Sequence, residues 1–142
     1  MENVIDWYDM ALERLNPESI ADPVNDLYSQ VVVSSGEKTV HVAGTTSRDR
    51  EGTVVGDTYE EQIATTLTNV EESLAAAGAG PGDVARQTIF ALDCEAFVEE
   101  AYPHVVEFYG EDALPASALI GADSLAHPDY LLELEVTAVV DG

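Results

Sequence analysis

The C-terminal ten residues limit the possible folds more than any other part of the chain. Residues 131–140 (LLELEVTAVV) alternate in side-chain character, a period of two that predicts a β-strand. One side carries Leu132, Leu134, Val136, Ala138 and Val140. The other side carries Glu133 and Glu135, followed by Thr137 and Val139. We therefore expect a sheet with one face buried under another layer and one face turned to solvent or to another subunit.

A long amphipathic helix is the natural covering layer. From Asp57 onwards, apolar residues recur at steps of three and four: Tyr59, Ile63, Leu67, Val70, Leu74 and Ala77. Asp57 followed by Glu60 predicts a capping box at the start of this helix. Gly78 and the Gly80-Pro81-Gly82 turn predict its end.

The remaining patterns complete an α+β order. We predict a hairpin of residues 31–33 and 40–43, strands at 84–92 and 116–120, and a second helix at 95–109. Pro103 inside that second helix requires a kink. The resulting order is ββαβαββ, with the two helices on one face of a mixed sheet. An amphipathic pattern at residues 3–15 predicts an additional N-terminal helix, so we divide the chain into an arm, 1–15, and a domain, 16–142.

The charge of the chain is extreme. Twenty-eight Asp and Glu face five Lys and Arg, for a formal net charge of −23. At molar salt the Debye length is about 3 Å, so repulsion between the carboxylates destabilises the folded chain only slightly, and the surface stays hydrated. We interpret the composition as adaptation to high internal salt. The acids are spread from Glu2 to Asp141, which argues against one acidic docking patch, and no Lys/Arg cluster exists for nucleic acid.

Several function classes are disfavoured by missing patterns. No run of 18 apolar residues predicts a membrane span, and the N-terminus lacks the features of a signal peptide, so we expect a cytoplasmic protein. Cys94 stands alone between Asp93 and Glu95, where neighbouring acids disfavour a thiolate. The histidines lack metal-ligand spacing, so we expect neither a metal nor a cofactor.

Glu135 is the most informative polar residue of the C-terminal strand. A carboxylate there is either solvated at an exposed edge or placed in a dry cleft, where its pKa would rise toward the range useful for general acid–base catalysis. The alternation alone leaves both interpretations open.

A series of local motifs resembles the reactive-intermediate deaminase (Rid) family, also called YjgF/YER057c/UK114. In order, they are Leu15-Asn16-Pro17-Glu18, Tyr28-Ser29-Gln30, Val42-Ala43-Gly44, the Gly52 to Gly56 loop, Ala75-Ala76-Ala77-Gly78, Ala85-Arg86-Gln87-Thr88-Ile89-Phe90 with Asp93, Phe97 through Phe108-Tyr109-Gly110, Pro115-Ala116 and Leu132-Glu133-Leu134-Glu135-Val136. The match covers about residues 15–140 with spacings close to those of the family.

This resemblance implies a chorismate-mutase-like fold and a homotrimer whose clefts between subunits bind small metabolites. The best-known subgroup hydrolyses 2-imino and enamine acids to 2-keto acids and ammonia without a cofactor. The family positions of a cleft tyrosine, a glycine backbone contact and a water-positioning glutamate correspond to Tyr28, to Gly44 with Thr45 beside it, and to Glu135.

The chain departs from the family at the residue that binds the substrate carboxylate. The active subgroup has an arginine after Pro-Ala, and this chain has Ser117, which offers a hydrogen bond but no charge. The family asparagine of the second helix is also absent near Ala101. Two hypotheses follow: a deaminase-like hydrolase with Glu135 as acid–base residue and Ser117 as polar anchor, or a non-catalytic binding or sensor protein. Arg48 and Arg50 either replace the missing arginine or are solvated loop residues. The anionic surface argues against the endoribonuclease activity associated with some relatives.

Overall fold

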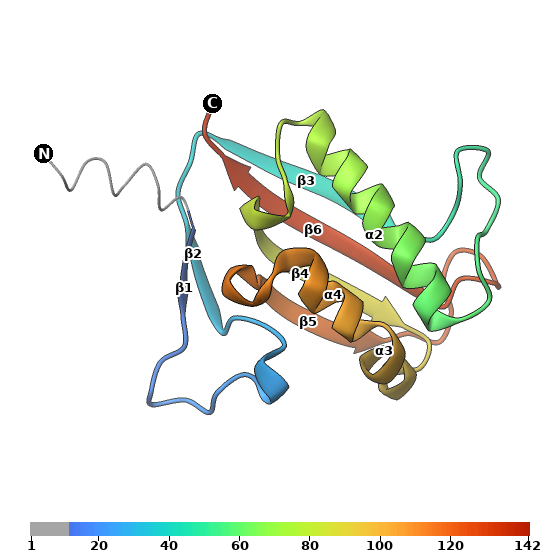
Figure 1. Ribbon diagram of the computed structural model, residues 1–142, viewed down its shortest axis with the longest axis horizontal. Helices are drawn as coiled ribbons and strands as arrows, with labels where there is room; N and C mark the ends of the chain where they lie inside the picture. Colours follow the sequence, from blue (N-terminus) through green and yellow to red (C-terminus); the bar gives the residue numbers. More distant parts are fainter. Residues whose placement is uncertain (1–11) are drawn as a thin grey trace, which may run out of the picture.

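The main sheet contains four strands in the spatial order β3-β6-β4-β5 (Figure 1). This is the arrangement in a computed structural model, which describes residues 12–142. The strands are β3 (Lys38–Thr45), β4 (Val84–Ala91), β5 (Ala116–Gly121) and β6 (Leu132–Val140). β4 and β5 are parallel and the other neighbours are antiparallel, so the sheet is mixed as predicted.

A second, two-stranded sheet pairs β1 (Leu12–Leu15) with β2 (Val31–Ser34). The prediction of a helix through residue 15 is therefore wrong for Leu12–Leu15, while residues 3–11 of that prediction lie outside the described residues. The β-branched run of β2 supplies the backbone partners that hold this segment extended. Arg14 also fixes it, because its Nε and Nη2 donate to the carbonyls of Leu114 and Gly82 at 3.2 and 3.3 Å.

The predicted hairpin of residues 31–33 with 40–43 is also wrong. β2 and β3 are consecutive along the chain but belong to different sheets. β3 pairs instead with β6, in a register that runs from Lys38 opposite Val140 to Thr45 opposite Leu134. The long alternating strand β6 thus offers β3 a more extensive ladder than the four residues of β2 can.

Helix α2 (Tyr59–Ala76) begins one residue later than the capping prediction placed it. Thr58, rather than Asp57, is the N-cap, and its Oγ1 accepts from the backbone N–H of Glu61 at 3.1 Å. Glu61 in turn accepts from the backbone N–H of Asp57 at 2.9 Å. Gly78 adopts φ +76° just after the helix, as the predicted glycine stop requires.

The second predicted helix is divided in two, α3 (Cys94–Glu100) and α4 (Tyr102–Tyr109). Asp93 caps α3 by accepting from the backbone N–H of Ala96 at 3.1 Å. Pro103 lies in the first turn of α4, where its missing N–H breaks no helical hydrogen bond. The proline therefore starts a new helix.

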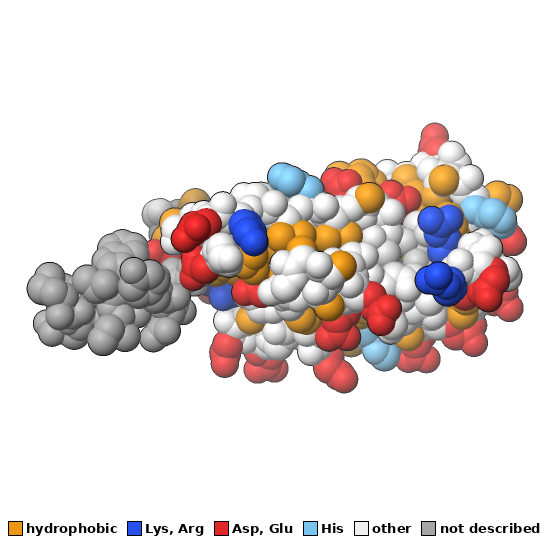
Figure 2. Space-filling view, turned by 90° about the horizontal axis from the view of Figure 1, so that it is seen from above, with side chains coloured by type: hydrophobic (Ala, Val, Ile, Leu, Met, Phe, Trp, Pro, Cys, Tyr) orange, Lys and Arg blue, Asp and Glu red, His pale blue; other side chains and the backbone are white. Residues whose placement is uncertain are grey.

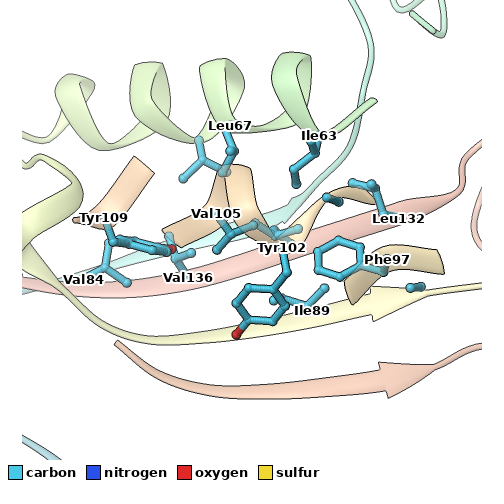
Figure 3. Close-up of a cluster of buried hydrophobic side chains, with 14 of the residues drawn as sticks. Ile63, Leu67, Val84, Ile89, Phe97, Tyr102, Val105, Tyr109, Leu132 and Val136 are labelled. Atoms are coloured by element: carbon cyan, nitrogen blue, oxygen red, sulfur yellow. The ribbon is translucent and has the colours of Figure 1, made fainter. Parts of the chain in front are cut away.

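Helices α2, α3 and α4 cover the same face of the sheet, the arrangement predicted for the two helices expected from the sequence, and the apolar core lies between the two layers (Figures 1 and 3). Side chains from both layers are buried there, among them Ile63, Leu67, Val84, Ile89, Phe97, Tyr102, Val105, Tyr109, Leu132 and Val136. None of the described helices is long and apolar enough to cross a membrane.

Among the described residues, no helix lies over the opposite face of the sheet. The cross-strand pairs on this open face are polar or mixed: Phe90 with Glu133, Thr88 with Glu135, and Arg86 with Thr137. On the two edge strands, His41 and Ile120 are exposed. The open face is thus the surface that the sequence pattern assigned to solvent or to another subunit.

Candidate functional site

A hollow of about 760 Å³ lies at the β3 edge of the main sheet. Its walls come from the end of β3, the loop of residues 46–58, the outer side of α2 and the segment before β6. The residues that line it are Gly44, Thr45, Thr46, Arg48, Asp49, Arg50, Asn69, Glu72, Ser73, Ala126, Tyr130 and Glu133. An irregularity in the ladder between Val42 and Thr45 turns the end of β3 toward this space.

Gly44 and Glu133 make a close contact within the hollow. A Cβ atom at Gly44 would lie 2.8 Å from the side-chain carboxyl carbon of Glu133, so no larger residue fits without moving that carboxylate. Beside them, Thr45 Oγ1 donates to the carbonyl of Ala43 at 2.8 Å. The predicted pair Gly44 and Thr45 therefore lies in one site with Glu133.

The environment of Glu133 disfavours its charged form. Partial burial raises the pKa of this half-buried carboxyl, and the nearby Glu135 carboxylate raises it further. Across the ladder its neighbour is Phe90, which offers no charge or hydrogen bond. Glu133 is consequently suited to exchange a proton closer to neutral pH than an ordinary surface glutamate.

This pKa shift predicts a pH-dependent gain in stability for Glu133→Gln. Ionisation of Glu133 opposes folding because the carboxyl holds its proton more tightly in the folded chain. The cost is absent below the ordinary glutamate pKa of about 4.5 and grows as the pH rises through the folded-state pKa. The melting temperature of the variant minus that of the wild type should therefore increase between about pH 4 and pH 7.

Glu99→Gln on the exposed surface of α3 is the control, since it removes the same charge far from the hollow. Melting curves of the three proteins in molar salt make the comparison. A difference for Glu133→Gln that follows the Glu99→Gln difference at every pH would contradict the special position of Glu133.

Glu135 occupies a different environment. It is exposed and lines a separate hollow of about 340 Å³ on the open face, together with His41, Arg86 and Thr137. The family resemblance pointed to Glu135, and the alternation of β6 could not correct that choice, because Glu133 and Glu135 point to the same side of the strand. The register of β6 against β3 separates them, since only Glu133 lies over Gly44.

Ser117 and Tyr28 lie elsewhere, around the β5 edge of the sheet. Ser117 accepts a hydrogen bond from Gln87 Nε2 at 3.1 Å, and its hydroxyl lies 3.2 Å from the hydroxyl of Tyr102. Tyr109 donates to Gln87 Oε1 at 3.0 Å, which fixes the orientation of that amide. Burial raises the pKa of Tyr102, and Tyr28 is near enough to add to this rise. The result is a network of neutral hydrogen-bonding groups with no cation in it.

The residues predicted to bind substrate therefore form two groups, and the predicted catalytic residue Glu135 lines the separate smaller hollow. Gly44 and Thr45 lie on β3 and Ser117 lies on β5, and these strands are the opposite edges of the main sheet. Three strand spacings of about 4.8 Å each separate the edges, so the groups are roughly 14 Å apart across the sheet. One chain by itself does not bring them together.

The histidines are scattered over the described part of the chain: His41 on β3, His104 on α4 and His127 before β6. His104 Nε2 lies 3.2 Å from a carboxylate oxygen of Glu60. Within residues 12–142, no three His, Cys, Asp or Glu side chains gather as metal ligands would.

Comparison with known families matches residues 20–140 to the family described as Endoribonuclease L-PSP. The chain belongs to this family, which is also called Rid or YjgF. A Rid-family protein of unknown function from Yersinia pestis, YyfB, is 30% identical over 92% of this chain and 99% of its own, with a TM-score of 0.85. A member of the YjgF/YER057c/UK114 family from Mycobacterium tuberculosis is 31% identical over 80% of this chain and 86% of its own, with a TM-score of 0.61.

Yeast Mmf1 shares the fold at 24% identity, with a TM-score of 0.66 over 91% of this chain and 98% of its own. No curated protein matches the sequence. Membership of the Rid family and a mixed α+β fold with α2, α3 and α4 on one face of the sheet are both confirmed. Within residues 12–142 the order is βββαβααββ, because β1 precedes the predicted strands and the second predicted helix is divided.

Proposed function

We propose that this Rid-family protein hydrolyses small imines or enamines to keto compounds and ammonia, with Glu133 as the acid–base residue. The observation that supports this most directly is the position of Glu133: half-buried, over Gly44, in a hollow, with a raised pKa. Glu135, the glutamate predicted from the sequence, lies in a smaller hollow on the open face and is the less favourable candidate.

The reaction can be written with this chain's own groups. The Glu133 carboxylate accepts a proton from a water molecule as the water oxygen attacks the imine carbon. The C=N π electrons move to the nitrogen, which takes up this proton from the Glu133 carboxyl. The Glu133 carboxylate then accepts the proton of the newly formed hydroxyl group and passes it to the nitrogen. The C–N bond breaks as the carbonyl group forms, and ammonia leaves, so no cofactor or oxidant is required.

We propose that each complete site lies between two subunits of a homotrimer. The two groups of predicted residues occupy opposite edges of one sheet, so the β5 edge of one copy could meet the β3 edge of the next. Contacts of this head-to-tail kind close into rings when the rotation allows. The uncovered sheet face and the exposed side chain of Ile120 supply surface for such a contact. Light scattering in molar salt should give three times the 15.2 kDa mass of the chain.

A second function, metabolite binding without catalysis, has one specific observation in its favour. The family resemblance assigns the arginine of the active subgroup to the position of Ser117, and the neutral network of Ser117, Tyr102 and Gln87 provides no charge to a substrate carboxylate. A binding or sensor protein could keep the cleft without the chemistry.

Ammonia release from freshly generated 2-iminopropanoate, 2-iminobutanoate and aminoacrylate decides between the two functions. In molar salt, we expect the wild type to release ammonia faster than the uncatalysed background. Ser117→Arg is assayed in parallel. No activity in the wild type together with activity in Ser117→Arg would reject the hydrolase and assign the wild-type cleft to binding.

A further inference from the structure

The loop of residues 46–58 forms a fixed wall of the hollow. Its two sides are bridged between Arg48 and Val54, and Asp49 Oδ1 accepts from the backbone N–H of Thr53 at 2.9 Å. Asn69 on α2 holds the loop from outside, because its Nδ2 donates to the carbonyls of Thr46 and Arg48 at 3.1 and 2.9 Å. The backbone that carries Arg48 and Arg50 therefore has a defined position, although both side chains are exposed.

The buried side chain of Gln62 on α2 fixes the opposite wall. Gln62 Nε2 donates to the carbonyls of Gly56 and Asp129 at 3.1 and 2.8 Å, and its Oε1 accepts from the backbone N–H of Leu131 at 2.9 Å. One side chain thereby joins the loop of residues 46–58 to the segment that precedes β6. The hollow is held open from both sides before any ligand binds, which lowers the entropy cost of binding.

Arg48 and Arg50 both line this hollow, and neither makes an ion pair. Within residues 12–142, the ion pairs are His104 with Glu60 and His127 with Asp129. In a chain with 28 acidic residues and four arginines, two of the four arginines thus lie at one hollow. Figure 2 shows basic side chains (blue) close together at the end of the molecule that carries this loop, with acidic side chains nearby.

The same hollow also carries carboxylates, from Asp49, Glu72 and Glu133. A ligand with only negative charge would be repelled by these three groups, and a doubly charged phosphate more strongly than a carboxylate. A ligand with only positive charge would meet the two arginines. The mixed lining therefore favours a ligand that carries both charges, with its carboxylate toward the guanidinium groups and a protonated nitrogen toward the acids.

We propose that Arg48 and Arg50 form the carboxylate-binding subsite of this protein, in a hollow that takes a zwitterionic small molecule. The inference rests on the proposed function in one respect, namely that the bound nitrogen lies on the Glu133 side of the hollow. In this arrangement the positive charge that would bind the carboxylate lies at the β3 edge, whereas Ser117 on β5 carries none. Neither arginine belongs to the motifs that resemble the family. Guanidinium groups suit this role because each can hold a carboxylate through two parallel hydrogen bonds.

Binding of stable compounds tests the subsite without any catalytic step. Isothermal titration in molar potassium chloride would use four probes: L-2-aminobutanoate with both charges, 2-oxobutanoate with the carboxylate only, butylamine with the nitrogen only, and inorganic phosphate. We expect L-2-aminobutanoate to bind most tightly. Arg48→Gln and Arg50→Gln should each weaken it about 10- to 100-fold, as expected for the loss of one charge-assisted hydrogen-bonding partner.

Lys38→Gln is the matched control, since it removes one positive charge at the far end of β3 and lies outside the hollow. Its affinity for L-2-aminobutanoate should equal that of the wild type. Arg48→Lys should retain part of the affinity, because the charge stays but the two-pronged geometry is lost. Circular dichroism of each variant checks that the fold is intact.

Three outcomes would overturn the proposal: no probe binds the wild type, phosphate binds more tightly than L-2-aminobutanoate, or the Arg48 and Arg50 variants bind as the Lys38 variant does. Turnover is measured separately. A protein that binds L-2-aminobutanoate through Arg48 and Arg50 but releases no ammonia would refute the hydrolase and leave the subsite standing.

Discussion

Glu133→Gln is expected to lower the rate of imine hydrolysis by about 10²- to 10⁴-fold, the usual contribution of a general acid–base residue. Glu135→Gln should leave the rate within a few-fold of the wild type. The two residues are separated by one position on β6 and share the same face of the sheet. Only Glu133 contacts Gly44 and lines the larger hollow, so the proposed chemistry depends on it alone.

Ammonia release under single-turnover conditions measures both rates, and glutamine keeps the shape of the side chain while it removes the acid. Glu135→Gln is the matched control, because it removes an equal charge from the same strand and the same face. Equal losses in both variants would point to the charge of the sheet face instead of a specific acid–base group. A loss confined to Glu135→Gln would instead identify Glu135, the residue selected from the family resemblance, as the acid–base group.

Local periodicity predicted most of the secondary structure because the forces behind it are local. The stripe from Ile63 to Leu74 buries one side of α2, and the alternation of Leu132, Leu134 and Val136 buries one side of β6. Each pattern requires a partner layer, so together they predict helices on one face of a sheet. The helix break at Pro103 followed from the missing N–H of proline in the same local way.

Strand pairing was not predictable in this way. β2 and β3 are separated by a short turn and resemble a hairpin, yet β3 pairs with β6, roughly a hundred residues further along the chain. β2 then pairs with β1, a segment whose own pattern favoured a helix. The local sequences of β2 and β3 do not indicate that β1 and β6 are their partners, because the energy of strand pairing comes from contacts between residues distant in sequence.

The candidate site was only partly predictable for the same reason. Gly44 and Thr45 do lie in one hollow, but the choice of Glu133 over Glu135 depends on the register between β3 and β6. The involvement of Arg48 and Arg50 depends on Asn69, an α2 side chain whose hydrogen bonds to the loop have no sequence signature. Motif resemblance supplied candidate positions, and tertiary contacts decided which of them meet.

Transfer from molar potassium chloride to about 0.1 M should lower the melting temperature by roughly 10–20 °C. The net charge is −23, and within residues 12–142 no Lys or Arg forms an ion pair with a carboxylate. Screening by salt is therefore the main effect that weakens the repulsion between carboxylates. The Debye length grows from about 3 to 10 Å over this range, which restores repulsion worth several kcal/mol between carboxylates. For a chain of this size, each kcal/mol shifts the melting temperature by about 2–4 °C.

Differential scanning calorimetry across a potassium chloride series measures this effect, and two controls identify its cause. Sucrose at matched osmolality should not replace the salt, because it does not screen charge. At a pH near 4 the salt dependence should shrink, since many of the carboxylates are then protonated and the charge that salt must screen has fallen. A melting temperature that is flat in salt, or that sucrose restores as well as potassium chloride does, would contradict adaptation of this surface to high internal salt. The acidic composition would then need a different explanation, in which the carboxylates face a specific partner instead of the solvent.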